Sequence, residues 1–81
     1  MAPYCPPDAH YAHISMDGLS KEQLNYITGV KGRNLYKWTS RYGLKYMWMD
    51  FENKRLELWG AFSAFENGAL PKVVSEIEKK M

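Results

Sequence analysis

The motif Gly29-Val30-Lys31-Gly32 constrains this chain most, because it lies between two short segments with helical patterns. Residues 20–28 begin with a serine N-cap and place apolar side chains three positions apart. Residues 33–42 carry apolar side chains at helical spacing and are followed by a glycine, a common residue at helix C-termini. We therefore expect two helices, joined by a tight glycine turn, that pack on another layer of structure.

The remaining segments predict a small sheet for that layer. Residues 10–16 alternate weakly, residues 44–51 are rich in strand-forming residues, and residues 55–59 alternate cleanly after a short turn. Residues 61–66 are expected to form a short helical turn, and a last helix begins near Pro71. We therefore expect an α+β domain, a three-stranded sheet with three helices on one face, in the order β-α-α-β-β-α.

The length of 81 residues is enough for one domain. Residues 1–9 contain three prolines and little periodicity, so we expect a disordered or extended tail there and a single folded domain over residues 10–81. The chain has one cysteine, no apolar run near 18 residues, and a start unlike a signal peptide. We expect an intracellular protein without membrane association, and the sequence does not distinguish cytoplasm from nucleus.

The segment Ile27-Thr28-Gly29-Val30-Lys31-Gly32-Arg33-Asn34-Leu35-Tyr36-Lys37-Trp38 resembles the KH (K homology) family. The family's pattern there is two apolar residues, then GxxG, then a helix that opens with basic or polar residues. The similarity runs from about Ile14 to the C-terminus. Because two strands and a helix follow the GxxG helix, the resemblance implies the type I KH arrangement. It also implies that single-stranded nucleic acid binds at the loop and in a groove beside it.

Physical chemistry gives the loop a binding role of its own. Glycine lets a nucleic-acid backbone approach without a Cβ in the way, and a helix N-terminus favours phosphate. The net charge is only +2, yet no acidic residue lies between Glu22 and Asp50. That segment holds five basic residues: Lys31, Arg33, Lys37, Arg41 and Lys45. Arg41 lies two turns from the loop, and a solvent-exposed role is about as plausible for it as a binding role.

The expected ligand is single-stranded nucleic acid, with RNA preferred to DNA. Phosphate contacts at the loop would position the strand, and the groove would read the bases. By the resemblance, Ile27, Lys45 and Tyr46 line that groove. The expected binding residues are Ile27, Gly29, Val30, Lys31, Gly32, Arg33, Asn34, Lys37, Lys45 and Tyr46.

The alternative is a KH-fold module for protein interaction or self-association that does not bind nucleic acid. Strict alternation places Leu44, Tyr46 and Trp48 on the helix-covered face of the sheet. The opposite, uncovered face would then carry a candidate interface for a second copy or a protein partner: Met47, Met49, Phe51 and Trp59.

No arrangement of residues points to an enzyme. The GxxG motif lacks the lysine and hydroxyl residue that end a phosphate-binding P-loop. Cys5, His10 and His13 invite a zinc hypothesis, but the two histidines would point to opposite faces of a strand and a fourth ligand is missing. We expect no catalytic residues, no metal and no cofactor.

Overall fold

The computed structural model describes residues 6–80 and has a mixed α+β fold. The first half runs through β1 (His10–Ser15), α1 (Lys21–Thr28), a single 3-10 turn (Val30–Gly32) and α2 (Arg33–Arg41). The second half runs through β2 (Leu44–Asp50), β3 (Arg55–Gly60), α3 (Phe62–Glu66) and α4 (Ala69–Lys80). The strands and the two helices around the loop lie where the sequence predicts them. The segment 61–66, expected as a turn, is a short helix, so the described chain has one α-helix more than expected.

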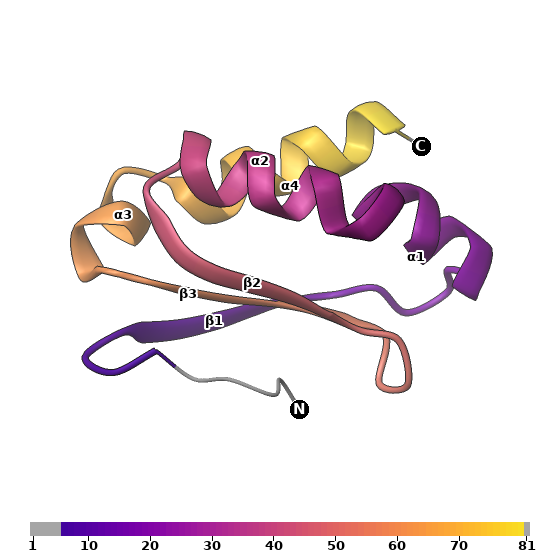
Figure 1. Cartoon of the computed structure of the whole chain (residues 1–81), viewed down its shortest axis with the longest axis horizontal. Helices are drawn as coiled ribbons and strands as arrows, with labels where there is room; N and C mark the ends of the chain where they lie inside the picture. The colour runs from indigo at the N-terminus through magenta and orange to yellow at the C-terminus, as the bar shows by residue number, and fades with distance from the viewer. Residues whose placement is uncertain (1–5, 81) are drawn as a thin grey trace.

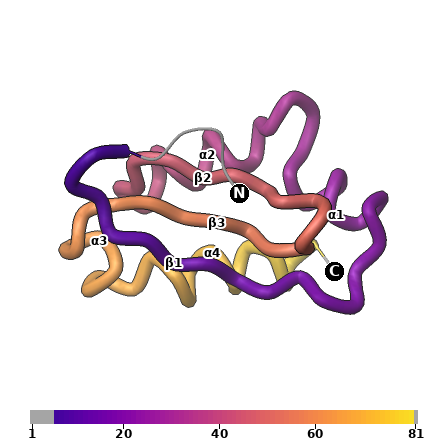
Figure 2. The backbone as a smooth tube through the Cα atoms, turned by 90° about the horizontal axis from the view of Figure 1, so that it is seen from below, coloured from indigo at the N-terminus to yellow at the C-terminus, as the bar shows by residue number. Residues whose placement is uncertain are grey.

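The sheet is antiparallel with the order β1-β3-β2, so β3 is the central strand. Figure 1 shows α1, α2 and α4 in one layer above the sheet, with α3 beside the end of β3. Seen from below, α2 runs along the β2 edge and α4 along the β1 edge (Figure 2). This arrangement leaves one face of the sheet without helices and places the N-terminus of α2 beside β2.

A capping box fixes the start of α1 and so the register of the segment that leads into the loop. The Ser20 side chain accepts a hydrogen bond from the Gln23 backbone N–H at 3.2 Å, and the Gln23 side chain accepts one from the Ser20 N–H at 2.8 Å. Two N–H groups that a helix start would leave unpaired are thereby satisfied. The helix ends at Gly29, whose φ of 83° stops it.

The core lies between the sheet and the three covering helices. Its most deeply buried side chains come from α1, the central strand and α4: Leu24, Ile27, Leu56, Leu58 and Val73. Truncating a buried leucine to alanine costs about 2–5 kcal/mol, a large share of the stability of a domain this small. The core therefore fixes the relative positions of the loop and the sheet.

A β-bulge at Lys45 inverts the predicted faces of β2. Leu44 pairs with Gly60, but Tyr46 already pairs with Trp59, so one extra residue lies between them. Because side chains alternate along a strand, one extra residue sends every later side chain to the opposite face. Met47 and Met49 consequently face the helices and are buried in the core.

The face without helices is organised as three rows across the strands. The rows are Tyr11–Trp59–Tyr46, His13–Glu57–Trp48 and Ser15–Arg55–Asp50. The Trp59 ring lies 5.0 Å from the Tyr11 ring and 5.5 Å from the Tyr46 ring. Glu57 accepts hydrogen bonds from Arg55 Nε at 3.1 Å and from the Tyr11 hydroxyl at 3.2 Å. This face is a network of rings and charges, and none of the methionines between residues 6 and 80 belongs to it.

The expected interface of Met47, Met49, Phe51 and Trp59 is therefore wrong as a set. The two methionines belong to the core, and Phe51 is partly buried against it. Trp59 does lie on the face without helices, but it is only 5% exposed. The physical reason is that strict alternation does not hold through a strand that contains a bulge.

Candidate nucleic-acid interface

The GxxG loop is a tight turn built from left-handed backbone conformations. Gly29, Lys31 and Gly32 have φ values of 83°, 55° and 76°. For lysine, which has a side chain to accommodate, this region costs about 1–2 kcal/mol. Strain of this kind persists where the surrounding structure imposes it, and it is frequent at ligand sites. The turn places Val30, 80% exposed, and the exposed Lys31 at its tip.

Asn34 braces the loop from within. Its side-chain Nδ2 donates a hydrogen bond to the backbone oxygen of Ile27 at 3.0 Å, which ties the end of α1 to the first turn of α2. A Cβ at Gly29 would lie 2.9 Å from the same Nδ2 atom, so only glycine fits there. Asn34 thus shapes the loop, and its amide nitrogen is already engaged with the protein's own backbone.

Basic residues follow the loop in two different environments. Lys31, Arg33, Lys37 and Lys45 are exposed, and no ion pair involves any of them within residues 6–80. Arg41 instead donates to Glu76 of α4 at 2.7 Å. The basic stretch seen in the sequence therefore divides into four exposed residues without an ion pair in the described chain and one arginine that is paired with Glu76.

Glu76 joins the end of α2 to α4 through two donors. The Tyr42 hydroxyl donates to the carboxylate at 3.0 Å, as Arg41 does at the shorter distance given above. The hydrogen bond from Tyr42 and the charge of Arg41 hold the pKa of Glu76 below its usual value. Arg41 therefore links α2 to α4, a role that differs from both the binding role and the purely solvent-exposed role considered from the sequence.

A groove of about 280 Å³ lies beside the loop, between α2 and β2. Its walls come from the loop, one side of α2, the bulged strand and the residue after it. The lining residues are Thr28, Lys31, Gly32, Leu35, Tyr36, Thr39, Lys45, Tyr46, Met47, Trp48, Met49 and Phe51. None of these is acidic, so the only formal charges in the lining are those of two lysines.

The polar groups of the groove are largely turned into the protein. The hydroxyls of Thr28 and Thr39 donate to backbone oxygens one helical turn earlier, at 2.8 and 2.6 Å. Burial, with smaller contributions from the charges of Tyr36 and Glu57, raises the pKa of Tyr46. The groove is accordingly apolar at its base, and its lysines lie at the two rims, which suits a ligand with flat rings and an anionic backbone.

The structure brings together only part of the predicted site. Lys31, Gly32, Lys45 and Tyr46 line the groove, and Gly29, Val30 and Arg33 lie in or next to the loop. Ile27 is fully buried in the core, so the expectation that it contacts bases is wrong.

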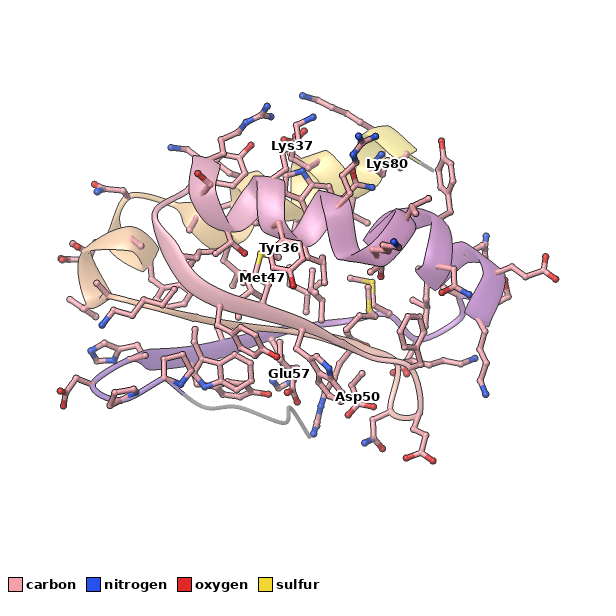
Figure 3. All side chains as sticks on the ribbon, in the orientation of Figure 1. Tyr36, Lys37, Met47, Asp50, Glu57 and Lys80 are labelled. Atoms are coloured by element: carbon pink, nitrogen blue, oxygen red, sulfur yellow. The ribbon has the colours of Figure 1, made fainter. Side chains whose placement is uncertain are left out.

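Lys37 and Tyr36 illustrate what the sequence pattern misjudged on α2. Figure 3 shows Lys37 on the side of α2 away from the sheet, whereas Tyr36 points toward Met47. Lys37 does not line the groove, and Tyr36, which the sequence interpretation passed over, does. The signal was present, because Gly32, Tyr36 and Thr39 share one face of a helix at spacings of four and three.

A metal-holding group and a membrane-spanning helix were each sought among residues 6–80. Between residues 6 and 80, no group of three or more His, Cys, Asp or Glu side chains is arranged to hold a metal ion. Cys5, part of the zinc hypothesis, lies outside the described residues. No helix among the described residues combines the length and apolar character that crossing a membrane requires.

Neither protein-family models, nor curated proteins, nor solved structures gave a significant match. The function is therefore inferred from the geometry of the loop and groove.

Proposed function

We propose that this chain is a KH-type domain that binds single-stranded nucleic acid, RNA in preference to DNA, without catalysing a reaction. The observation that carries the proposal is the position of the strained, exposed, basic GxxG loop at one end of an apolar groove with lysine rims. Backbone N–H groups at the start of α2, together with Lys31 and Arg33, would hold phosphates. Lys45 on the opposite rim would hold the strand from its other side.

The order of the elements supports the same proposal. Apart from the short helix α3, the order of strands and helices is the one that the type I KH resemblance implies. The alternative, a protein-interaction module, relied on a patch that included Met47 and Met49, and both methionines are buried. A partner or second copy on the sheet face without helices would have to use the tyrosine and tryptophan rows instead.

The test is a titration of fluorescently labelled single-stranded RNA and DNA pools with the protein, followed by anisotropy. In a double variant, Val30→Asp with Lys31→Asp, two carboxylates would face the phosphates while the fold stays intact, because both side chains are exposed. We expect affinity to fall at least about tenfold, since each lost phosphate contact also removes counterion release.

The matched control places the same change of charge away from the groove. Phe62→Asp with Lys72→Asp also alters one exposed apolar and one exposed lysine side chain, and neither residue lines the groove. Retained binding in this control with loss in the loop variant supports the proposal. An equal loss of affinity in both variants would mean that binding is non-specific charge attraction, which would contradict a binding role for the loop. No binding by the wild-type protein would overturn the proposed function.

A further inference from the structure

Tyr36 is a large aromatic side chain that the fold leaves exposed at the groove. It lies on α2 one turn after Gly32 and is 74% exposed. A Cβ at Gly32 would lie 3.6 and 3.9 Å from two of its ring atoms, so the ring lies next to the loop backbone. Figure 3 shows the side chain directed toward Met47. The ring therefore borders the loop on one side and the groove on the other.

The other exposed aromatic side chains each have a partner within the described chain. Tyr26 lies under the Lys80 ammonium, Phe62 lies 5.2 Å from the His10 ring, and Tyr11 packs on Trp59. No ring, cation or hydrogen-bond partner of Tyr36 is found among residues 6–80. A ligand could therefore contact the exposed Tyr36 ring without displacing a contact of these kinds within the described chain.

The surroundings of Tyr36 match the two parts of a nucleotide. The groove floor beneath it is apolar, with Leu35, Met47 and Met49 buried or nearly so. Tyr46 of β2 also lines the groove, although its ring packs on Trp59 at 5.5 Å, on the face of the sheet without helices. Lys31 at the loop and Lys45 at the strand provide positive charge at the rims. A flat ring, an apolar floor and flanking cations suit a base joined to phosphates on either side.

We propose that Tyr36 is a stacking platform for one base of the bound strand, and that this contact selects single strands over duplexes. The inference rests on the proposed function, because it deepens the role of the same groove. Stacking needs an unpaired base that can leave its neighbours, which a duplex does not offer without unpairing. Stacking is tolerant of sequence, since every base has a π-face. The platform therefore adds affinity for unpaired bases with little preference among them.

A double-mutant cycle between protein and ligand tests this contact directly. A short single-stranded RNA of mixed sequence is compared with a set of derivatives that each lack one base. Dissociation constants are measured for the wild-type protein and for Tyr36→Ala, Tyr36→Phe and Tyr26→Ala. Tyr26 is the matched control because it is also a helical tyrosine, 62% exposed, and it does not line the groove.

We expect one abasic position to weaken wild-type binding by about fivefold or more, and Tyr36→Ala to weaken binding of the intact RNA by a similar factor. When Tyr36→Ala is combined with removal of that base, the loss of affinity should be no larger than the loss from either change alone. Tyr36→Phe keeps the ring face and Tyr26→Ala leaves the groove intact, so both should bind within about twofold of wild type.

The outcomes separate this inference from the proposed function. The stacking proposal is overturned if Tyr36→Ala binds the intact RNA as tightly as wild type does. It is also overturned if, at every position, the losses of affinity from Tyr36→Ala and from base removal simply add. The proposed function survives that result when Val30→Asp with Lys31→Asp still weakens binding by at least about tenfold. If the wild-type protein binds none of the RNAs, both proposals fail. Equal affinity of wild type for the single strand and its duplex would also contradict the selection of single strands.

Discussion

The two ends of α2 carry basic side chains that the structure treats in opposite ways. At the C-terminal end, Arg41 is paired with Glu76 at 2.7 Å and shares that carboxylate with Tyr42. At the N-terminal end, Lys31 and Arg33 are exposed beside a strained loop, with no ion pair in the described chain. Charge of one sign on one helix therefore serves packing at one end and, on our proposal, a ligand at the other. A basic stretch in a sequence does not by itself separate these two roles.

The largest effect on this contrast is expected from the loop backbone. Gly29→Ala places a Cβ 2.9 Å from Asn34 Nδ2 at a φ of 83° and disrupts the hydrogen bond to Ile27. We expect a loss of about 2–4 kcal/mol in the free energy of unfolding, from backbone strain and the lost hydrogen bond. Chemical denaturation measures it.

Gly18→Ala is the matched control for that substitution. Gly18 also has a positive φ, of 88°, but its Cβ would meet no atom within 4 Å. It should cost only the backbone strain, about 1–2 kcal/mol. Equal losses for the two variants would show that Asn34 does not brace the loop as described.

Effects of intermediate size are expected from substituting one basic residue at each end of α2 and comparing the losses of affinity and of stability. Lys31→Gln should weaken binding of single-stranded RNA by about fivefold and reduce the slope of log K against log salt by about 0.7, with stability unchanged. Arg41→Gln should do the reverse, keeping affinity within about twofold while slightly lowering the thermal midpoint. Binding isotherms at several salt concentrations and thermal melts of both variants give the four values. A larger loss of affinity from Arg41→Gln than from Lys31→Gln would contradict the proposed difference between the two ends of α2.

The smallest expected effect is a pH dependence confined to the C-terminal end. The pKa of Glu76 is lowered in the folded protein, first by the Tyr42 hydrogen bond and then by Arg41. A lowered carboxyl pKa adds stability above the unfolded value, near 4.5, and that stability is lost as the pH falls through the folded value.

Glu76→Gln removes this titrating group and tests the pH prediction. Denaturation of both proteins between pH 7 and pH 3 should show a smaller loss of stability with acidification in the variant. Identical pH profiles would mean that the Glu76 carboxylate does not link α2 to α4. Asp50 provides a separate acid-sensitive group in both proteins, because hydrogen bonds from Asn53 lower its pKa.

The sequence predicted the elements better than the directions of their side chains. Glycines, the Ser20 cap and strand-forming runs act locally, so the strands and the helices around the loop were found close to their true positions. The bulge at Lys45 depends on how β2 pairs with a strand farther along the chain, and no local pattern marks it. That single residue exchanged the faces of Met47 and Tyr46 and so misplaced both the groove floor and the expected interface.

The residues predicted from the sequence and the residues that line the candidate groove share the loop and differ around it. The loop residues followed from the glycine spacing, which also fixes the close fit of Asn34 against Gly29. Ile27 was assigned to the groove by resemblance, yet its position on the apolar stripe of α1 places it in the core. The charge pattern of α2 favours Lys37 over Tyr36 as a binding residue, yet Lys37 lies one residue on and on another side of the helix.

The most direct test of the loop-and-groove proposal is an amide NMR titration of the wild-type protein with single-stranded RNA and, separately, single-stranded DNA at low salt. We predict shifts concentrated at residues 28–36 and 45–49, weakened by added salt and larger with RNA, while the amides around Arg41 and Glu76 stay nearly unchanged. Shifts centred on the rows of Tyr11, Glu57 and Trp59, or no shifts with either ligand, would contradict it.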